Sequence, residues 1–376
     1  MTAAPAAESN AVVRAGNGLA AGENRVISLN VLAQPAIDTA ALLAWVEKAK
    51  PPYLLVMDEI EVGRRVEMTS PRTQIVFRRY RPDDHELAAK LKPADFLASV
   101  ADVPMGWIVQ AGNEPGGDQV LLATWTAALI RQADQIGRRL AVGNWSVGNP
   151  DDEAVANGKY DLVLQALADS GRHLLGLHEY FYDAPLAEPY FVGRYRGFLR
   201  RADALGIKRP AVFIGEHGRD LGGGHDGWRA QGWSEADYAR RLEEAQQVYA
   251  ADGICACVFS FGAGFNQRWQ TYNVEGAPEL LRRMAAMNDQ IVEVDDMVPG
   301  YVKVKTRQAG ANVNVRLGPG LKHAAVTTVK TGDWVKRLPG GTISADGYTW
   351  ANVAVDKDAN SHVHGWCALE VIEVGG

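Results

Sequence analysis

The chain has 376 residues, more than the roughly 250–300 at which a single hydrophobic core stops growing, so we expect one large and one small domain. Its 39 basic and 45 acidic residues leave a net charge of −6, which argues against a broad nucleic-acid-binding surface, because such a surface needs clustered Lys and Arg. The 47% apolar and 22% charged composition is that of a globular protein, and no apolar run approaches the roughly 18 residues of a transmembrane helix.

Residues 1–24 are rich in Ala, Gly and Asn. They lack the basic segment followed by an apolar core that marks a signal peptide. We therefore interpret them as a flexible lead-in, and the secretion route stays open.

Short apolar, β-branched runs then alternate with longer helical patterns. Near-continuous apolar runs indicate strands that are covered on both faces, as parallel sheets require. The eight predicted strands are Arg25–Leu32, Tyr53–Ile60, Thr73–Tyr80, Gly106–Asn113, Arg139–Ser146, His173–Tyr180, Pro210–Glu216 and Ile254–Gly262.

The segments between these runs have helical periodicity, clearest in Thr39–Lys50, Gln119–Arg138 and Ser234–Ala251. The second crossover, Val62–Pro71, is short and charged, and we expect at most a brief helix there. Eight strand–helix repeats predict an α/β fold, a (β/α)8 TIM barrel over residues 25–290. A doubly wound open sheet is the alternative, but no GxGxxG follows the first strand.

Two glutamates stand at the carboxyl ends of predicted barrel strands, where TIM barrels carry their chemistry. The fourth strand runs into Asn113-Glu114-Pro115 and the seventh into Glu216-His217. Glycoside cleavage needs such a pair, in which one carboxyl protonates the leaving oxygen and the other attacks the anomeric carbon. The simpler alternative is an exposed loop acid and a structural acid paired with a nearby Arg. An acid that ends an apolar strand has to be paired or have a shifted pKa, which favours the functional interpretation.

These residues resemble the clan A glycoside hydrolases: Asn113-Glu114 after strand four, His178 and Tyr180 on strand six, and Glu216 after strand seven. The resemblance implies that Glu114 is the acid/base and Glu216 the nucleophile of a retaining O-glycoside hydrolase, which acts by two-glutamate double displacement and needs no cofactor. It further implies that Asn113 binds the sugar 2-hydroxyl, and that Tyr180 or His178 orients Glu216 and keeps its pKa low. The expected partner is a glycan substrate, a β-linked polysaccharide or a cell-wall glycan.

Strand alternation divides the residues of strand six between two faces. His178 and Tyr180 share one face and Glu179 lies on the other, because the side-chain period of a strand is two. If the first two line the mouth, Glu179 faces the helices, where a structural ion pair is expected. His217 alternates away from Glu216, although its position at a turn keeps the rim within reach.

Further substrate-binding residues are expected near the ends of strands one, three and five and in the loop after strand eight. They are Asn30, Arg78, Asn144, Trp145 and Trp269. The sequence does not distinguish Arg78 from its neighbour Arg79. Trp228 and Trp233 also lie near strand ends, where their rings either stack on sugars or anchor loops.

Clan A enzymes often carry a tryptophan on strand eight, where this chain has Ser260-Phe261. Either Trp269 replaces it from the following loop, or that subsite is built differently. The glycine-rich loop Arg219–Trp233 has the composition of a mobile flap. Its His225 and Asp226 are a weak metal signal, and no metal is expected.

Three cysteines do not make a disulfide framework. Cys255 and Cys257 share one face of a predicted strand, which favours small core residues. Cys367 lies in the C-terminal region.

After a predicted linker at residues 291–300, short strands and turn signals predict a small all-β module over residues 301–376. This module resembles the bacterial SH3 domain in Val313–Gly320, Lys330–Asp333, Trp350–Val353 and Gly365–Cys367. The resemblance implies a non-catalytic domain with a cell-wall ligand, peptide or glycan. Its aromatic residues belong either to the core or to a binding surface; they are Tyr348, Trp350 and Trp366.

Two alternatives to a polysaccharide hydrolase remain open at this point. One is a phage-type or bacterial peptidoglycan-lytic enzyme, and the other is a non-catalytic carbohydrate-binding barrel. The SH3-like module favours an extracellular or cell-wall-associated location, although no signal peptide is visible.

Overall fold

The computed structural model describes residues 26–33, 37–182, 191–220, 226–264, 267–289, 301–304, 312–330, 334–358 and 361–373. The chain divides into two compact units, Met1–Gln290 and Ile291–Gly376. The predicted lead-in at 1–24 and the predicted linker at 291–300 lie outside the described residues, as does His225.

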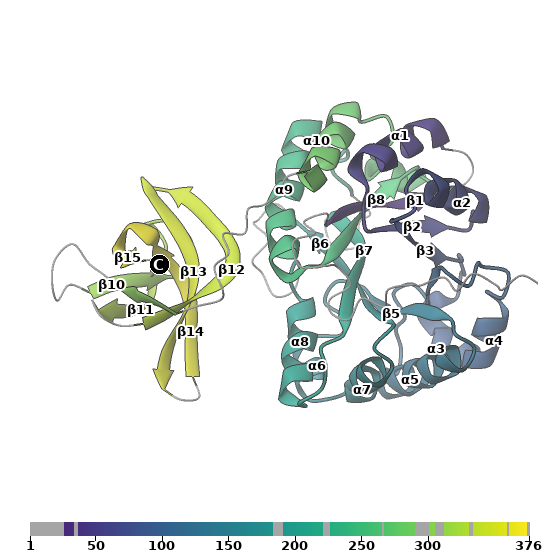
Figure 1. Ribbon diagram of the computed structural model, residues 1–376, viewed down its shortest axis with the longest axis horizontal. Helices are drawn as coiled ribbons and strands as arrows, with labels where there is room; N and C mark the ends of the chain where they lie inside the picture. The colour runs from purple at the N-terminus through teal and green to yellow at the C-terminus, as the bar shows by residue number, and fades with distance from the viewer. Residues whose placement is uncertain are drawn as a thin grey trace, which may run out of the picture. The chain divides into compact units, whose positions relative to one another are not determined.

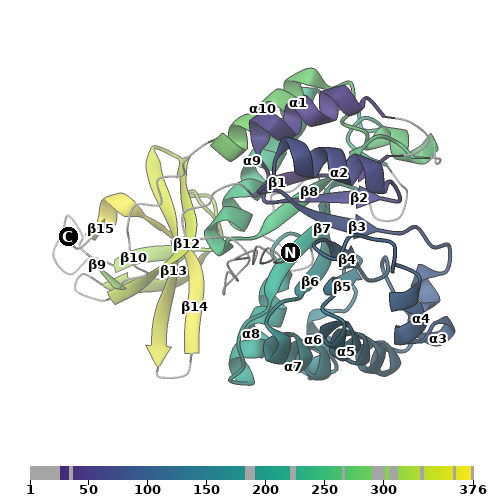
Figure 2. The same cartoon turned by 45° about the vertical axis from the view of Figure 1, so that its right-hand side comes forward.

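Within the described residues, eight parallel strands form a closed barrel in which each strand pairs with the next in chain order and β8 pairs with β1 (Figures 1 and 2). This closure confirms the predicted TIM barrel and excludes the doubly wound open sheet. The strands are β1 (Ile27–Leu32), β2 (Tyr53–Met57), β3 (Gln74–Arg78), β4 (Ile108–Gln110), β5 (Arg139–Trp145), β6 (Leu174–Phe181), β7 (Ala211–Arg219) and β8 (Cys255–Phe261).

Helices cover the outside of the barrel (Figure 1). The α-helices are α1 (Thr39–Ala49), α2 (Ile60–Thr69), α3 (Leu87–Lys90), α4 (Pro93–Ala98), α5 (Gln119–Gln135), α6 (Asp152–Ala156), α7 (Asp161–Ser170), α8 (Tyr195–Ala204), α9 (Glu235–Asp252) and α10 (Pro278–Asp289). Two single 3-10 turns, η1 (Asp84–Glu86) and η2 (Gln267–Thr271), follow β3 and β8.

The expectation of at most a brief helix in the second crossover was wrong, because α2 is ten residues long. Its buried stripe is narrow and consists of Gly63 and Val66. Gly63 packs so closely beneath Trp107 that any Cβ would collide with the indole ring. Part of the contact that holds this charged helix on the barrel is therefore made by a glycine, which an apolar pattern does not reveal.

Helix ends follow local sequence chemistry. The side chains of Asp118 and Ser234 cap α5 and α9 by accepting backbone N–H bonds from the first turn. Gly253 ends α9 in the left-handed conformation, with φ 65°. The predicted start and end of α9 are thereby confirmed.

Side chains that point into the barrel form two zones. The lower zone is an apolar cluster that fills the interior; it consists of Tyr53, Leu55, Val76, Ile108, Ala141, Leu174, Phe213, Cys255 and Cys257. We call this cluster the barrel floor. Cys255 and Cys257 are buried free cysteines in it, which confirms their interpretation as small core residues. The upper zone, nearer the carboxyl ends of the strands, is polar and is described below as the mouth.

The register shifts at four strand pairs near the mouth within the described residues: between β7 and β8, between β1 and β8, where Phe259 and Phe261 pair with the adjacent residues Asn30 and Val31, and at the two pairs described next. The register between β5 and β6 shifts between Gly143 and Trp145, and Asn144 has φ 48°. The register between β6 and β7 shifts so that His178 pairs with Glu216 rather than with Gly215. An extra residue of this kind reverses the side-chain phase of everything that follows it on the strand.

The second unit is all-β, as predicted. Its antiparallel sheet has the order β11-β10-β14-β13-β12-β9-β15 within the described residues. The strands are β9 (Tyr301–Val304), β10 (Asn312–Arg316), β11 (Ala325–Lys330), β12 (Trp334–Ala345), β13 (Tyr348–Asp358), β14 (Ser361–Ala368) and β15 (Ile372–Glu373), and the 3-10 turn η3 (Leu369–Val371) precedes β15.

The core of this unit is a cluster of valines together with Cys367. Trp350 is buried and donates its indole N–H to the carbonyl of Ala345, so it is a core residue. Tyr348 is 39% exposed, and its ring meets Trp350 edge-on. The resemblance to the bacterial SH3 domain stays a prediction.

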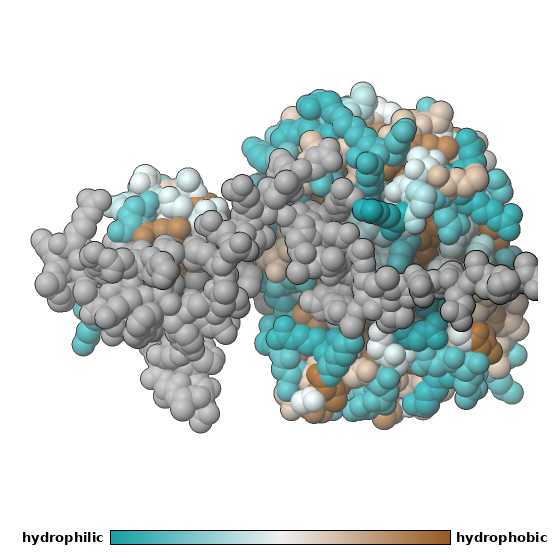
Figure 3. Space-filling view, in the orientation of Figure 1, coloured by the Kyte–Doolittle hydropathy of each residue, from teal (hydrophilic) through white to brown (hydrophobic). Residues whose placement is uncertain are grey.

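The face of the molecule drawn in Figure 3 is mainly hydrophilic where residues are coloured, and apolar side chains are scattered over it. None of the helices among the described residues is long and apolar enough to cross a membrane.

Candidate active site

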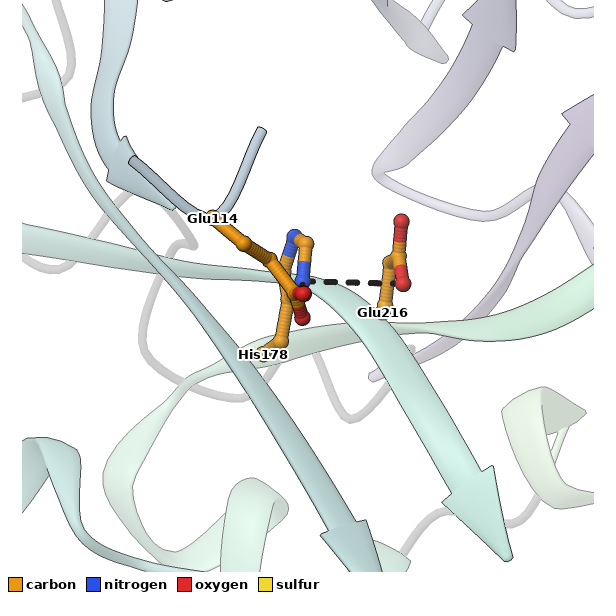
Figure 4. Close-up of side chains that lie close together, drawn as sticks. All are labelled: Glu114, His178 and Glu216. Atoms are coloured by element: carbon orange, nitrogen blue, oxygen red, sulfur yellow. Dashed lines mark hydrogen bonds and ion pairs between the residues drawn. The ribbon is translucent and has the colours of Figure 1, made fainter. Parts of the chain in front are cut away.

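Two glutamates and a histidine meet at the mouth of the barrel (Figure 4). Glu216 stands on β7, His178 on β6, and Glu114 in the turn that follows β4. Each offers one atom, and the three atoms lie within 4.8 Å of one another. Segments that are distant in sequence thus place two carboxylates side by side, as the strand-end argument predicts.

Glu216 is buried and held by two donors. Nη1 of Arg78 lies 3.1 Å from Oε1 of Glu216, and the Tyr180 hydroxyl donates to Oε2 at 2.7 Å. Burial and the neighbouring charge of Glu216 raise the pKa of Tyr180 well above its usual range, so the phenol keeps its proton and stays a donor. Arg78 and Tyr180 thus hold one oxygen each of the Glu216 carboxylate.

The structure separates the two arginines that the sequence left equivalent. Arg78 points inward to Glu216, whereas Arg79 pairs with Asp102, with 2.7 Å between Nη2 and Oδ2. Arg78 is the residue at the mouth.

Glu114 has a different environment. Its side chain is 39% exposed, against 9% for Glu216, and Nδ1 of His178 lies 2.9 Å from its Oε1. Burial raises the pKa of Glu114, but the hydrogen bond to His178 and the positive charges of His178, Arg78 and Arg194 outweigh it and hold that pKa below its usual range. His178 also approaches Oε2 of Glu216, at 3.5 Å.

The turn that carries Glu114 has an uncommon backbone. Glu114 has φ 48°, in the left-handed region that few non-glycine residues adopt, and its N–H donates to the carbonyl of Asn144 at 2.9 Å. A neighbouring strand end therefore fixes the acid in place.

Glu114, His178 and Glu216 form the one group of metal-ligand side chains found among the described residues. The guanidinium of Arg78 already neutralises Glu216 at 3.1 Å, and a cation between the carboxylates would lie close to that positive charge. The donor set suits proton transfer and nucleophilic attack better than it suits a metal ion.

Two of the predicted substrate-binding residues, Asn30 and Asn144, are fully buried and bind backbone. The amide of Asn30 donates to the carbonyl of Gly215, and that of Asn144 donates to the carbonyls of Ala111 and Ala141. Both residues support the strands that carry the glutamates, and the Oδ1 of each has no hydrogen-bond partner within the described residues. Their binding of substrate stays a prediction.

Asn113 differs from them in exposure. It is half-buried, next to Glu114, and its Oδ1, like those of Asn30 and Asn144, has no hydrogen-bond partner within the described residues. An unpaired buried acceptor of this kind is available to a ligand or to water. Its role toward a sugar hydroxyl remains a prediction.

The expectation that Trp145 binds substrate is corrected by the structure. Its ring is fully buried, stacks on Phe198 with 5.4 Å between centroids, and meets Tyr160 edge-on in the layer between barrel and helices. The shift at Asn144 turns Trp145 outward, so that it pairs with Leu177, another outward-facing residue.

Aromatic side chains form one wall of the mouth. Leu32, Met57, Tyr180, Phe259 and Tyr272 form a buried cluster with Trp269 packed against it. Trp269 meets Phe259 of β8 edge-on, with 5.9 Å between ring centroids. The sequence left open whether this loop tryptophan replaces a strand-eight tryptophan or the subsite is built differently. In the structure, Trp269 and Phe259 occupy that region together.

Trp228 and Trp233 are not part of this cluster. Trp228 is buried against Tyr238, with 5.3 Å between ring centroids, and donates its indole N–H to the carbonyl of Tyr272. Trp233 packs against Phe181. Both anchor loops.

Glu179 faces away from the mouth, as alternation predicts, but the expected ion pair is not what holds it. Its carboxylate accepts the N–H groups of Gly193 and Tyr195 and the hydroxyl of Tyr249. Burial raises its pKa to about 7. His217 lies beside it, fully buried, with a pKa lowered to about 4 by burial, so it does not reach the rim.

Sequence reasoning missed three polar residues near the mouth. Asp84, in η1, is buried, and burial raises its pKa to about 6 against the charges of Arg78 and Arg81. Gln110 ends β4 and points inward toward Gly215. Arg194 precedes α8 and is 5% exposed. The sequence has no signal that singles these residues out. Asp84 follows another aspartate, Asp83, and Arg194 is one of several arginines in and next to α8.

No protein-family model and no curated protein match the chain. Among solved structures it is similar to a family 39 glycoside hydrolase from the gut symbiont Bacteroides cellulosilyticus WH2, with 10% identity over 89% of this chain and 72% of that one and a TM-score of 0.49. It is also similar to a GH5-4 broad specificity endoglucanase from an uncultured bacterium, with 11% identity over 75% and 98% of the chains and a TM-score of 0.45.

A β-mannanase of Thermomonospora fusca is similar with 14% identity over 66% of this chain and 82% of that one, at a TM-score of 0.41. Identities of this size do not carry an activity over to this chain. Its function therefore rests on the residues at the barrel mouth.

Proposed function

We propose that the barrel is a retaining O-glycoside hydrolase in which Glu216 is the nucleophile and Glu114 the acid/base. The observation that carries the proposal is the pair itself: two carboxylate oxygens within 4.8 Å of each other in unlike surroundings. Retaining enzymes separate these groups by roughly 5–5.5 Å, and inverting enzymes need about 6.5 Å or more to admit a water molecule.

The unlike surroundings support the two roles. Arg78 and Tyr180 stabilise negative charge on Glu216, which a nucleophile needs. Glu114 is the more exposed of the two and can reach a leaving group. A bound sugar would cover that exposed surface, and the loss of water disfavours the charged form and raises the pKa of Glu114 toward that of a working acid.

The reaction then runs in two steps. Glu216 attacks the anomeric carbon while Glu114 gives its proton to the departing glycosidic oxygen, which leaves a glycosyl ester on Glu216. The negative charge of Glu216 is then gone, so Glu114 stays ionised more readily and takes a proton from the water that hydrolyses the ester. We expect Asn113, which is next to Glu114 and has an unpaired Oδ1, to bind the sugar 2-hydroxyl.

We further propose that the substrate is a β-linked polysaccharide or a cell-wall glycan. Trp269, which is only partly buried against Phe259 and Tyr272 of the aromatic wall, supplies apolar surface for a sugar ring at the mouth. The C-terminal unit, if SH3-like, would tether the barrel to an insoluble target and raise the local concentration of substrate.

Trapping with 2-fluoro glycosides, followed by peptide mapping, tests the mechanism. We expect a covalent label on Glu216 from at least one sugar of a panel, and the sugar that reacts reports the specificity. A label on another residue would overturn the assignment of the nucleophile.

Hydrolysis across a glycan panel by wild type, Glu114→Gln and Glu216→Gln tests the pair. Glu61→Gln, an exposed glutamate on α2, is the matched control and should keep full activity. Equal hydrolysis of an accepted substrate by all four proteins would refute the catalytic assignment. Sedimentation with purified cell walls, and their lysis, would favour peptidoglycan as the substrate over another β-linked polysaccharide.

A further inference from the structure

Glu179, Tyr249 and the backbone on either side of Arg194 form a buried hydrogen-bonded group on the outer face of β6, which we call the clamp. Glu179 faces outward from β6 and accepts the N–H of Gly193 at 2.7 Å and the N–H of Tyr195 at 3.0 Å. Tyr249 donates its hydroxyl to the same carboxylate at 3.1 Å. The backbone on either side of Arg194 is thereby tied to β6.

Arg194 extends from this clamp to β5. Its Nη2 donates to the carbonyl of Asn149 at 2.8 Å and lies 3.3 Å from the carbonyl of Trp145. The side chain is 5% exposed, and its Nε and Nη1 have no hydrogen-bond partner within the described residues. Burial of a guanidinium group in which only one nitrogen is hydrogen-bonded costs free energy. This cost indicates that the charge has a role besides holding the loop.

The end of β5 that Arg194 holds also holds Glu114. Asn144, the residue before Trp145, accepts the N–H of Glu114 at 2.9 Å. Contacts therefore run without a break from Glu179 through Arg194 and the end of β5 to the turn that carries the proposed acid/base.

Electrostatic interactions also connect Arg194 with Glu114. The positive groups whose charge acts on Glu114 are His178, Arg78 and Arg194, and the neighbouring acidic groups are Glu216 and the phenol of Tyr180. Arg194 in turn has Glu179, Asp152, Glu114 and Tyr160 around it. No hydrogen bond joins Arg194 to the Glu114 carboxylate in the part of the chain that the structure describes, so it acts at longer range.

We propose that Arg194, fixed by Glu179, is a positioning residue for Glu114, which it serves by anchoring the end of β5 and by supplying a buried positive charge. The consequence for catalysis rests on the proposed function, but the effect on Glu114 does not. A Glu114 that titrates too high would be a good acid in the first step and a poor base in the second. Arg194 opposes that drift.

The test measures the titration of Glu114 directly, with carboxyl-¹³C-labelled glutamate and NMR in the full-length chain. The Glu114→Gln variant assigns the signal. Arg194→Gln keeps a donor for the carbonyls but removes the charge, and Arg194→Lys keeps the charge on a different shape. Arg200→Gln, an exposed arginine on α8, the helix that Arg194 precedes, is the matched control.

We expect the Glu114 midpoint to rise in Arg194→Gln by about 0.5 pH units or more, to stay near wild type in Arg194→Lys, and not to move in Arg200→Gln. On an accepted glycoside, Arg194→Gln should lower kcat about tenfold with little change in KM and should shift the alkaline limb of the pH profile upward.

An unchanged Glu114 midpoint in Arg194→Gln, or the same shift in the Gln and Lys variants, would overturn the proposal. If Arg194→Gln does not fold, a midpoint in Arg194→Lys that moves as far as about 0.5 pH units would also overturn it, because the charge would then not be what matters. A shifted midpoint in a protein that cleaves no glycan would sustain the role of Arg194 and refute the proposed function instead.

Discussion

The floor and the mouth of the barrel are built from the same strands, yet they serve different purposes. At the floor, Tyr53, Leu55, Phe213 and their neighbours fill the interior with apolar side chains. Nearer the carboxyl ends of the strands, the inward-facing side chains are polar, and they include Arg78, His178 and Glu216. The apolar barrel floor stabilises the fold. Its contribution offsets the free-energy cost of burying three charged or polar groups at the strand ends.

The largest expected effect comes from the mouth. We expect Glu216→Gln to lower kcat/KM about a thousandfold or more on every accepted aryl glycoside, because the amide cannot form the ester. Glu114→Gln should lose about a hundredfold to ten thousandfold where the leaving group is a poor one, and much less where it needs no proton. Steady-state rates on a series of aryl glycosides measure both. If the two variants depend on the leaving group in the same way, the roles are not as assigned.

At the floor, the same strands should respond in stability and not in chemistry. Leu55→Ala removes a fully buried side chain and should lower the free energy of unfolding by about 2–5 kcal/mol. Chemical denaturation measures the loss, and kcat below the unfolding transition should stay within about twofold of wild type. A large fall in kcat at unchanged stability would show that floor and mouth are not separable.

Tyr180→Phe tests one hydrogen bond at the mouth. It removes the donor at 2.7 Å from Glu216, and hydrogen bonds to charged groups contribute about 1.5–3 kcal/mol, so kcat should fall about tenfold to a hundredfold. Tyr53→Phe makes the same change at the floor and should leave kcat unaltered. Equal effects from the two variants would contradict the contrast between the zones.

The smallest effect concerns Glu179 and His217, which lie side by side on the outer face and titrate in opposite senses. The folded-state pKa of Glu179 is raised to about 7, so the stability it contributes is lost as pH rises from about 4.5 to 7. That of His217 is lowered to about 4, so its contribution is lost as pH falls from about 6.5 to 4. Between pH 4.5 and 6.5 the two trends oppose each other.

Glu179→Gln should uncover the trend of His217. Relative to wild type, the free energy of unfolding should gain a slope of about 1.4 kcal/mol per pH unit between pH 5 and 6.5, with lower stability at the acid end. Urea unfolding at three pH values in this range, with Glu61→Gln as control, provides the comparison. Parallel pH curves for Glu179→Gln and wild type would show that the pair does not titrate as described.

Much of this protein could be predicted from its sequence alone. Apolar runs at barrel spacing predicted all eight strands, because strands buried on both faces leave an unbroken apolar signal, and the ends of those strands pointed to Glu114 and Glu216. Alternation within β6 placed His178 and Tyr180 inward and Glu179 outward, as the structure has them. These results depend on local periodicity, which the sequence contains in full.

Tertiary structure decided what depends on register and on close approach. Strict alternation from Phe213 would turn Glu216 toward the helices; the shift at Gly215 brings it into the mouth beside His178. A similar shift at Asn144 turns Trp145 away from the mouth, against the prediction. Inserting one residue into a strand reverses all later side chains, and its position is fixed by pairing with neighbouring strands, which a single run of residues does not record.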